Sequence, residues 1–226
     1  MPRFGFAVAL AGALLAGCSG SRHVHVSFDL RERIEASDTT VAAPDVEETF
    51  RVLLVGDAGA PQTDGSDPLL ATLRHHAMQA GPNSATIFLG DNIYPNGLPP
   101  VENPRRAEAE ARLRSQLDAV ADAPGRVFFI PGNHDWRHSR EGGRAQLLEQ
   151  EAFVESVLGE GSFLPSDGFP GPVEVELAED LTLLAIDTEW WLGVHERGEG
   201  QDPESGASIG ADEDFLIELV EAIEDA

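Results

Sequence analysis

Three short apolar segments, each followed within two residues by a glycine and then by polar residues, constrain the fold of this chain most strongly. The apolar segments span residues 50–55, 86–89 and 127–130. They lead into Gly-Asp-Ala-Gly at 56–59, Gly-Asp-Asn-Ile-Tyr at 90–94 and Gly-Asn-His-Asp-Trp at 132–136. Short apolar runs of this kind are typical of buried parallel strands, and ligands bind beyond the carboxyl ends of such strands. We therefore expect two carboxylates, a phenol, an amide and an imidazole to meet in one crevice, which suits a hard metal ion.

Amphipathic segments separate these strands. We expect helices at 67–79, 104–121 and 143–158, with apolar side chains gathered roughly on one side. Strands that alternate with helices imply right-handed crossovers and a largely parallel sheet, so the fold class is α/β. Two further apolar runs, at 173–177 and 181–186, predict an antiparallel hairpin or two adjacent strands, and an amphipathic helix is expected at 212–224.

The charge balance excludes some classes of partner. The chain has 226 residues, with 15 Lys and Arg against 40 Asp and Glu, which gives a net charge of −25. Binding to nucleic acid needs Lys and Arg to neutralise phosphates, and docking on anionic lipid by charge needs them too. We therefore expect no nucleic-acid partner, and we interpret the acidic surface mainly as a solvated one.

The N-terminus has the pattern of a targeting segment. Residues 4–16 are apolar but too few to span a bilayer, which needs ~20 residues. They end in Leu-Ala-Gly-Cys-Ser, and Cys18 is the only cysteine of the chain. This resembles a bacterial lipoprotein signal, in which the cysteine is acylated; the alternative is an ordinary signal peptide with a chance cysteine. The resemblance implies a lipid anchor in the membrane of the bacterial cell envelope, at the outer membrane or on the periplasmic face. We expect a signal peptide at 1–18, an acidic tether at 19–49 and one domain at 50–226.

The three glycine-containing segments, in this order and spacing, resemble those of the calcineurin-like metallophosphoesterases. The tyrosine in the second segment makes that segment most similar to the purple acid phosphatase branch. The resemblance covers residues 50 to about 191. It implies a layered sheet sandwich flanked by helices, a dinuclear metal centre and phosphate-ester substrates.

The resemblance also assigns metal ligands residue by residue. Asp91 resembles the carboxylate that bridges the two metals, and Asp57 resembles a terminal ligand of the first metal. Tyr94 resembles the phenolate ligand of a ferric ion, and Asn133 resembles the amide ligand of the second metal. The implied centre contains Fe(III) with Fe, Zn or Mn, and two such cations activate water for attack on a phosphate ester.

Catalytic roles are expected beside the metals. By resemblance, His134 stabilises the transferring phosphoryl group or protonates the leaving oxygen. Asp135 is expected to hold the tautomer of His134, and His138 lies close enough in sequence to reach the rim of the site. Trp190 and Trp191 are open to two interpretations, the mouth of a pocket or core packing, and large aromatic residues favour the core.

The family pattern is incomplete in this sequence. The family supplies three more histidine ligands, in a Val-x-x-His strand end and a Gly-His-x-His segment, and neither occurs here. His195 stands in Gly-Val-His-Glu, a different context. We therefore expect a domain incomplete at the C-terminus, with uncovered apolar faces.

Three functional hypotheses remain open. The first is an acid phosphatase-like enzyme that hydrolyses phosphate esters by hydroxide attack, active in a longer parent chain. The second is a non-catalytic lipid-anchored binding domain that retains half a metal site. The third is an enzymatic module of a larger envelope protein. The sequence leaves the substrate and the oligomeric state open.

Overall fold

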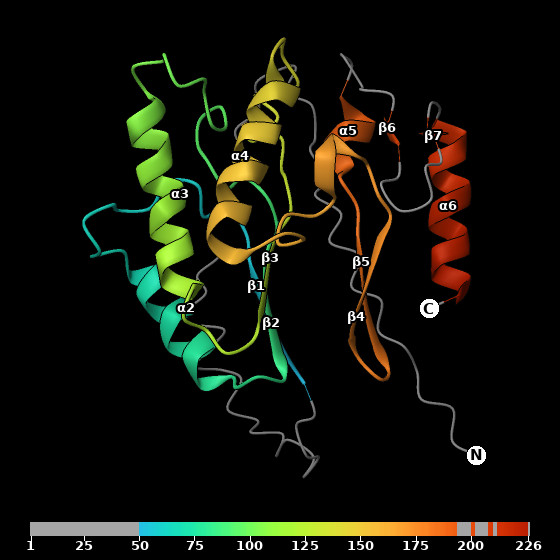
Figure 1. Cartoon of the computed structure of the whole chain (residues 1–226), viewed down its shortest axis with the longest axis horizontal. Helices are drawn as coiled ribbons and strands as arrows, with labels where there is room; N and C mark the ends of the chain where they lie inside the picture. Colours follow the sequence, from blue (N-terminus) through green and yellow to red (C-terminus); the bar gives the residue numbers. More distant parts are fainter. Residues whose placement is uncertain (1–49, 194–199, 202–207, 210–211, 226) are drawn as a thin grey trace, which may run out of the picture. The chain divides into compact units, whose positions relative to one another are not determined.

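A parallel sheet of three strands, in the order β1-β2-β3, forms the centre of the α/β part of the structure (Figure 1). The computed structural model describes residues 50–193, 200–201, 208–209 and 212–225, which belong to the unit Glu47–Ala226. The elements follow in the order β1 (Arg51–Val55), α2 (Pro68–Gln79), β2 (Ser84–Phe88), α3 (Arg106–Val120), β3 (Arg126–Phe129), α4 (Gly143–Leu158), the 3-10 turn η1 (Ser166–Gly168), β4 (Val173–Ala178), β5 (Leu181–Ala185), α5 (Thr188–Leu192), β6 (Gly200–Gln201), β7 (Ser208–Ile209) and α6 (Asp212–Asp225).

The sequence pattern predicted most of these elements. The three parallel strands, the antiparallel β4–β5 hairpin and the helices α2, α3, α4 and α6 lie within two residues of their predicted bounds. The mixed α/β fold with a parallel sheet is confirmed. The turn η1, the short helix α5 and the two-residue strands β6 and β7 were not expected, because each is too short to show a periodicity.

The two faces of the sheet belong to two different apolar cores. Alternate strand residues point to opposite faces, so Phe88 and Phe129 pack with the helices, their rings stacked with centroids 4.1 Å apart. Ile87 and Phe128 point the other way and pack with residues of the β4–β5 hairpin. Figure 1 shows α2, α3 and α4 on one side of the sheet and the hairpin on the other. The sheet is therefore held between two layers, with its strand ends left for loops.

The outer strand β1 has an uncovered face in the described part of the chain. Its only neighbour there is β2, and the side chains of Val52 and Leu54 are 39% and 58% exposed. The sequence led us to expect uncovered apolar surface. The longer parent chain that we inferred from it stays a prediction.

The N-terminal expectations lie outside the described residues. These are the signal peptide at 1–18 with Cys18, the tether at 19–49 and the boundary between tether and domain. His195 also lies outside them. Of the helices described, none combines the length and the apolar character needed to cross a membrane.

Candidate metal centre

The three glycine-containing loops meet at the carboxyl edge of the sheet. The strand ends are in register there, since the Leu89 amide donates to the Val55 carbonyl at 2.7 Å and the Ile130 amide donates to the Phe88 carbonyl at 2.8 Å. The loop after β1 also bonds to the loop after β2, because the Tyr94 amide donates to the carbonyl of Gly59 at 2.9 Å. The backbone therefore places the candidate residues of separate strands in one region, as the parallel topology requires.

A single phenol oxygen joins the two candidate carboxylates. The Tyr94 hydroxyl donates to Oδ1 of Asp57 at 2.6 Å, and the same oxygen lies 3.1 Å from Oδ2 of Asp91. A hydroxyl has one proton to donate, and the shorter contact identifies Asp57 as its acceptor. Three residues from two loops thus form one oxygen-rich group, as expected from the sequence.

The third loop adds His134 to the same group. Its backbone amide donates to Oδ1 of Asp91 at 3.1 Å, and its ring nitrogen Nε2 lies 4.0 Å from Oδ2 of Asp91. The rings of His134 and Tyr94 meet edge to face, with centroids 4.3 Å apart. Asn133 precedes His134 and belongs to the same loop, so each of the three loops contributes to the site.

The loops can approach so closely because of glycine. A Cβ on Gly132 would lie 2.5 Å from Oδ1 of Asp91 and still closer to the Asp91 amide nitrogen. A Cβ on Gly59 would collide with the backbone of the second loop, starting with the Asp91 carbonyl oxygen. Asp57 and Asp91 themselves have positive φ angles of 55° and 54°. Among residues other than glycine, aspartate and asparagine adopt this conformation most readily, which helps to explain an aspartate at both positions.

The comparison with protein families decides the identity of the fold. The family model described as calcineurin-like phosphoesterase matches residues 50–208, which is more than half of the chain. The chain belongs to the calcineurin-like phosphoesterase family. No curated protein and no solved structure matches it. Membership means metal-dependent hydrolysis of phosphoesters in general, and enzymes of this family generally bind two metal ions.

The donor set of this phosphoesterase fits a hard cation. Neither Asp57 nor Asp91 pairs with a lysine or arginine in the part of the chain that the structure describes, so both negative charges are left for another partner. Carboxylate, phenol and amide oxygens are ligands that hard cations prefer. No cluster of three or more His, Cys, Asp or Glu residues suited to a metal occurs among the described residues. The four predicted ligands Asp57, Asp91, Tyr94 and Asn133 thus amount to part of a site.

Tyr94 retains its proton firmly in this environment. Burial raises the pKa of the phenol above its ordinary value, and the hydrogen bond to Asp57 and the negative charges of both carboxylates raise it further. The neighbouring carboxylates disfavour a phenolate because like charges repel. A multivalent cation between these oxygens would reverse that balance, so in this site the phenolate form depends on bound metal.

The hydrogen-bond partners of Asp135 differ from the expected one. We expected its carboxylate to hold the tautomer of His134, but the ring nitrogen Nδ1 of His134 instead lies 2.7 Å from the carbonyl oxygen of Pro95. The fully buried Asp135 accepts hydrogen bonds from the backbone amides of Gly132, Asn92 and Ile93, and from the Asn92 side chain. It therefore ties the third loop to the second.

The pKa of Asp135 reflects this position. Burial raises the pKa of the carboxyl to about 6, and the hydrogen bonds from Gly132 and Asn92 oppose part of the rise. The carboxylate has no exposed surface. Its contacts indicate that it shapes the site, whereas its expected catalytic role stays untested.

The tryptophans belong mainly to the core. Trp190 is buried and Trp191 packs partly against the same apolar cluster, which fits the core interpretation. Asp187 caps α5 by accepting the amides of Glu189 and Trp190 at 3.0 and 3.1 Å, and it accepts the indole N–H of Trp136 at 2.6 Å. Apart from an aspartate at a strand end, no sequence pattern indicated these contacts.

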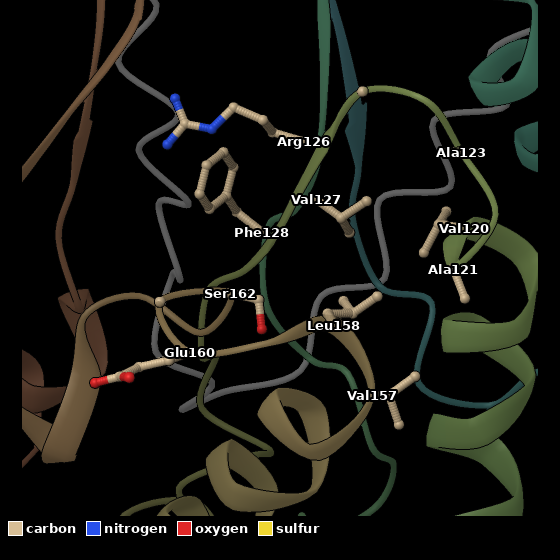
Figure 2. Close-up of a pocket in the computed structure, with 12 residues that line it drawn as sticks. Val120, Ala121, Ala123, Arg126, Val127, Phe128, Val157, Leu158, Glu160 and Ser162 are labelled. Atoms are coloured by element: carbon tan, nitrogen blue, oxygen red, sulfur yellow. The ribbon is translucent and has the colours of Figure 1, made fainter. Parts of the chain in front are cut away.

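A separate cavity lies near the amino end of β3. The cavity has a volume of about 370 Å³. Figure 2 shows residues that line it, such as Val120, Val157 and Leu158 near the ends of α3 and α4. Two charged residues, Arg126 and Glu160, line it. Arg126 is already engaged, because it donates to the carbonyl of Glu176 at 2.6 Å and lies over the ring of Phe128. None of the candidate metal ligands lines this cavity, so it is not the reaction site.

Proposed function

We propose that this domain hydrolyses phosphate monoesters in the manner of an acid phosphatase, at a dinuclear centre held in part by Asp57, Asp91, Tyr94 and Asn133. The observation that supports this most is the Tyr94 hydroxyl within hydrogen-bond distance of both Asp57 and Asp91. Three oxygen ligands from two loops converge here, and neighbouring carboxylates repel each other unless a cation lies between them. A cation is the partner that such a group lacks.

Each residue has a part in the proposed reaction. Asp91 would contact both ions, Asp57 and Tyr94 one of them and Asn133 the other. When bound, the ions supply Lewis-acid activation of water and neutralise charge on the phosphoryl oxygens. Deprotonated Tyr94 is a hard anionic donor and favours Fe(III), with Fe, Zn or Mn as the second metal. The remaining donors would come from outside the described residues, in line with the longer parent chain expected from the sequence.

His134 is suited to handle the leaving group. Because the Pro95 carbonyl can only accept, Nδ1 of His134 carries the proton in that contact, and Nε2 is the nitrogen that faces Asp91. A protonated Nε2 can therefore donate its proton to the ester oxygen as the bond to phosphorus breaks. The Pro95 carbonyl performs the orienting role that we had expected of Asp135.

The test combines metal content with hydrolysis of an aryl phosphate by the full reading frame. Asp91→Ala should remove bound metal and activity together, because this carboxylate is proposed to bridge the ions. Asp118→Ala is the matched control, since Asp118 is exposed and its side chain makes no hydrogen bond to any residue that the structure describes. Unchanged metal content in Asp91→Ala would refute the assignment.

A non-catalytic binding domain is the second candidate. It is favoured by the absence of a full cluster of metal-binding side chains from the described residues. In that case the full reading frame would bind a cation through Asp57 and Asp91 without hydrolysing any phosphate ester. The same two measurements therefore separate the candidates.

We also propose that the protein is anchored by lipid at Cys18, as its sequence predicts. Cys18 lies outside the described residues, so the proposal depends on the sequence pattern alone. Metabolic labelling with a radioactive fatty acid should mark the wild-type protein and not Cys18→Ser. Labelling of both proteins would contradict the anchor, and so would labelling of neither.

A further inference from the structure

The half-buried ring of His138 links the third loop to the second. Its Nδ1 lies 3.0 Å from the side-chain nitrogen of Asn133, and its Nε2 lies 3.1 Å from the carbonyl oxygen of Pro95. The same carbonyl oxygen is contacted by His134, and the two imidazole rings meet with centroids 4.1 Å apart. His138 therefore contacts the side chain of a candidate metal ligand, Asn133.

The Pro95 carbonyl determines the direction of these hydrogen bonds. A carbonyl oxygen only accepts, so Nε2 of His138 must carry a proton. In the neutral ring, Nδ1 is then an acceptor, and it requires the NH₂ end of the Asn133 amide. The amide must consequently turn its carbonyl oxygen away from the imidazole.

We propose that His138 is a positioning residue that fixes the Asn133 amide in the orientation needed by a cation. An unanchored asparagine can present either end, and only its oxygen is a ligand for a cation, whereas its NH₂ group repels one. Partners of metal ligands commonly change metal affinity by about 10- to 100-fold. The inference depends on the proposed metal-binding function and adds a residue that this function did not include.

The backbone around His138 supports the inference. Arg137, His138 and Ser139 have φ angles of 56°, 51° and 60°, three successive left-handed residues, none of them glycine. Each such residue costs roughly 1–2 kcal/mol, and strained backbone of this kind gathers at functional sites. The turn returns the chain so that the His138 amide donates to the Asn133 carbonyl at 2.6 Å. The turn thus brings His138 back to Asn133, whose side-chain amide its ring contacts.

Two substitutions separate the two contacts of the ring. The amide oxygen of asparagine lies close to the place of Nδ1, so His138→Asn keeps an acceptor for Asn133. The amide nitrogen of glutamine lies close to the place of Nε2, so His138→Gln keeps the bond to Pro95 and loses the acceptor. Urea denaturation first identifies conditions under which every variant is folded.

Titration of the purified protein from the full reading frame with Mn²⁺ alone, followed by electron paramagnetic resonance, measures cation binding. His138→Gln should weaken binding roughly 10- to 100-fold, and His138→Asn should bind close to the wild-type level. In an Asn133→Ala background, His138→Gln should have no further effect, because the ring acts through the amide. Equal affinities of the two His138 variants would overturn the inference, as would a full additional loss in the Asn133→Ala background.

A second measurement needs no metal. The ¹⁵N shifts of His138 in the metal-free chain should show the tautomer with the proton on Nε2, and the Asn133 side-chain amide should be immobilised in the wild type but not in His138→Gln. The opposite tautomer would overturn the inference. If the wild type bound no Mn²⁺, the proposed function would fail, while this spectrum would still decide the role of His138.

Discussion

Substitution of Gly132 tests whether the loops are packed as tightly as the structure shows. In Gly132→Ala the new Cβ would lie 2.5 Å from Oδ1 of Asp91, closer still to the Asp91 amide, and 3.1 Å from the Gly90 carbonyl carbon. Overpacking of this kind costs about 1–3 kcal/mol. Backbone atoms of a second loop cannot yield as a flexible side chain can, so we expect the upper part of that range, about 2–3 kcal/mol.

Gly56→Ala provides the matched control. Gly56 also precedes a candidate ligand at the end of a strand, but its φ is not positive and no atom lies within 4 Å of an added Cβ. Alanine at such a position loses less chain entropy on folding and adds about 0.4–1 kcal/mol of stability. The two substitutions are chemically identical and should change the free energy of unfolding in opposite directions.

Urea unfolding followed by tryptophan fluorescence measures both effects, since Trp136 and Trp190 are buried. For a domain of this size, a loss of about 2–3 kcal/mol lowers Tm by roughly 4–12 °C. Gly132→Ala should also weaken cation binding, because it displaces the Asp91 carboxylate. If Gly132→Ala were as stable as Gly56→Ala, the close contact between the second and third loops would be refuted.

Three further predictions follow from single side chains. Burial raises the pKa of Glu151 from 4.5 to about 7, so this group binds its proton more tightly in the folded state. Its contribution to stability is complete below pH 4.5 and is lost as the pH rises to about 7. Wild type should therefore lose about 3 kcal/mol more than Glu151→Gln over this interval in urea unfolding, and equal slopes against pH would contradict it. If Tyr94 binds Fe(III), the complete protein should show a visible phenolate-to-iron absorption band that Tyr94→Phe lacks, whereas a colourless, fully active zinc or manganese enzyme would count against this ligand. Asp135→Ala leaves buried backbone amides without an acceptor, which costs about 1–3 kcal/mol for each amide. A loss of less than about 1 kcal/mol in the free energy of unfolding, measured in urea, would show that Asp135 does not tie the loops together.

The sequence was sufficient to predict where the loops meet. Strand periodicity and the glycine after each apolar run predict a parallel sheet, and a parallel sheet places its carboxyl ends on one edge. The convergence of Asp57, Asp91 and Tyr94 follows from that topology alone. The expected bounds of the helices also agree with the observed ones within two residues, because the apolar spacing of each helix extends over several turns.

The partners of the imidazoles could not be predicted in the same way. The carbonyl of Pro95, which holds both His134 and His138, is a backbone group without a sequence signature. The turn that returns His138 to Asn133 depends on three left-handed residues, and two of them, Arg137 and Ser139, are of types that rarely adopt that conformation. Asp135 was assigned to the wrong partner because a neighbour in sequence was taken as a neighbour in space.

The central claim is that Asp57 and Asp91 hold the same cations, and a double-mutant cycle on Mn²⁺ affinity tests it most directly. The cycle compares Asp57→Asn, Asp91→Asn and the double variant in the full reading frame, with Asp118→Asn as the control. Shared binding predicts that the double variant loses much less affinity than the two single losses combined. Strictly additive losses, or losses no larger than that of Asp118→Asn, would contradict the account.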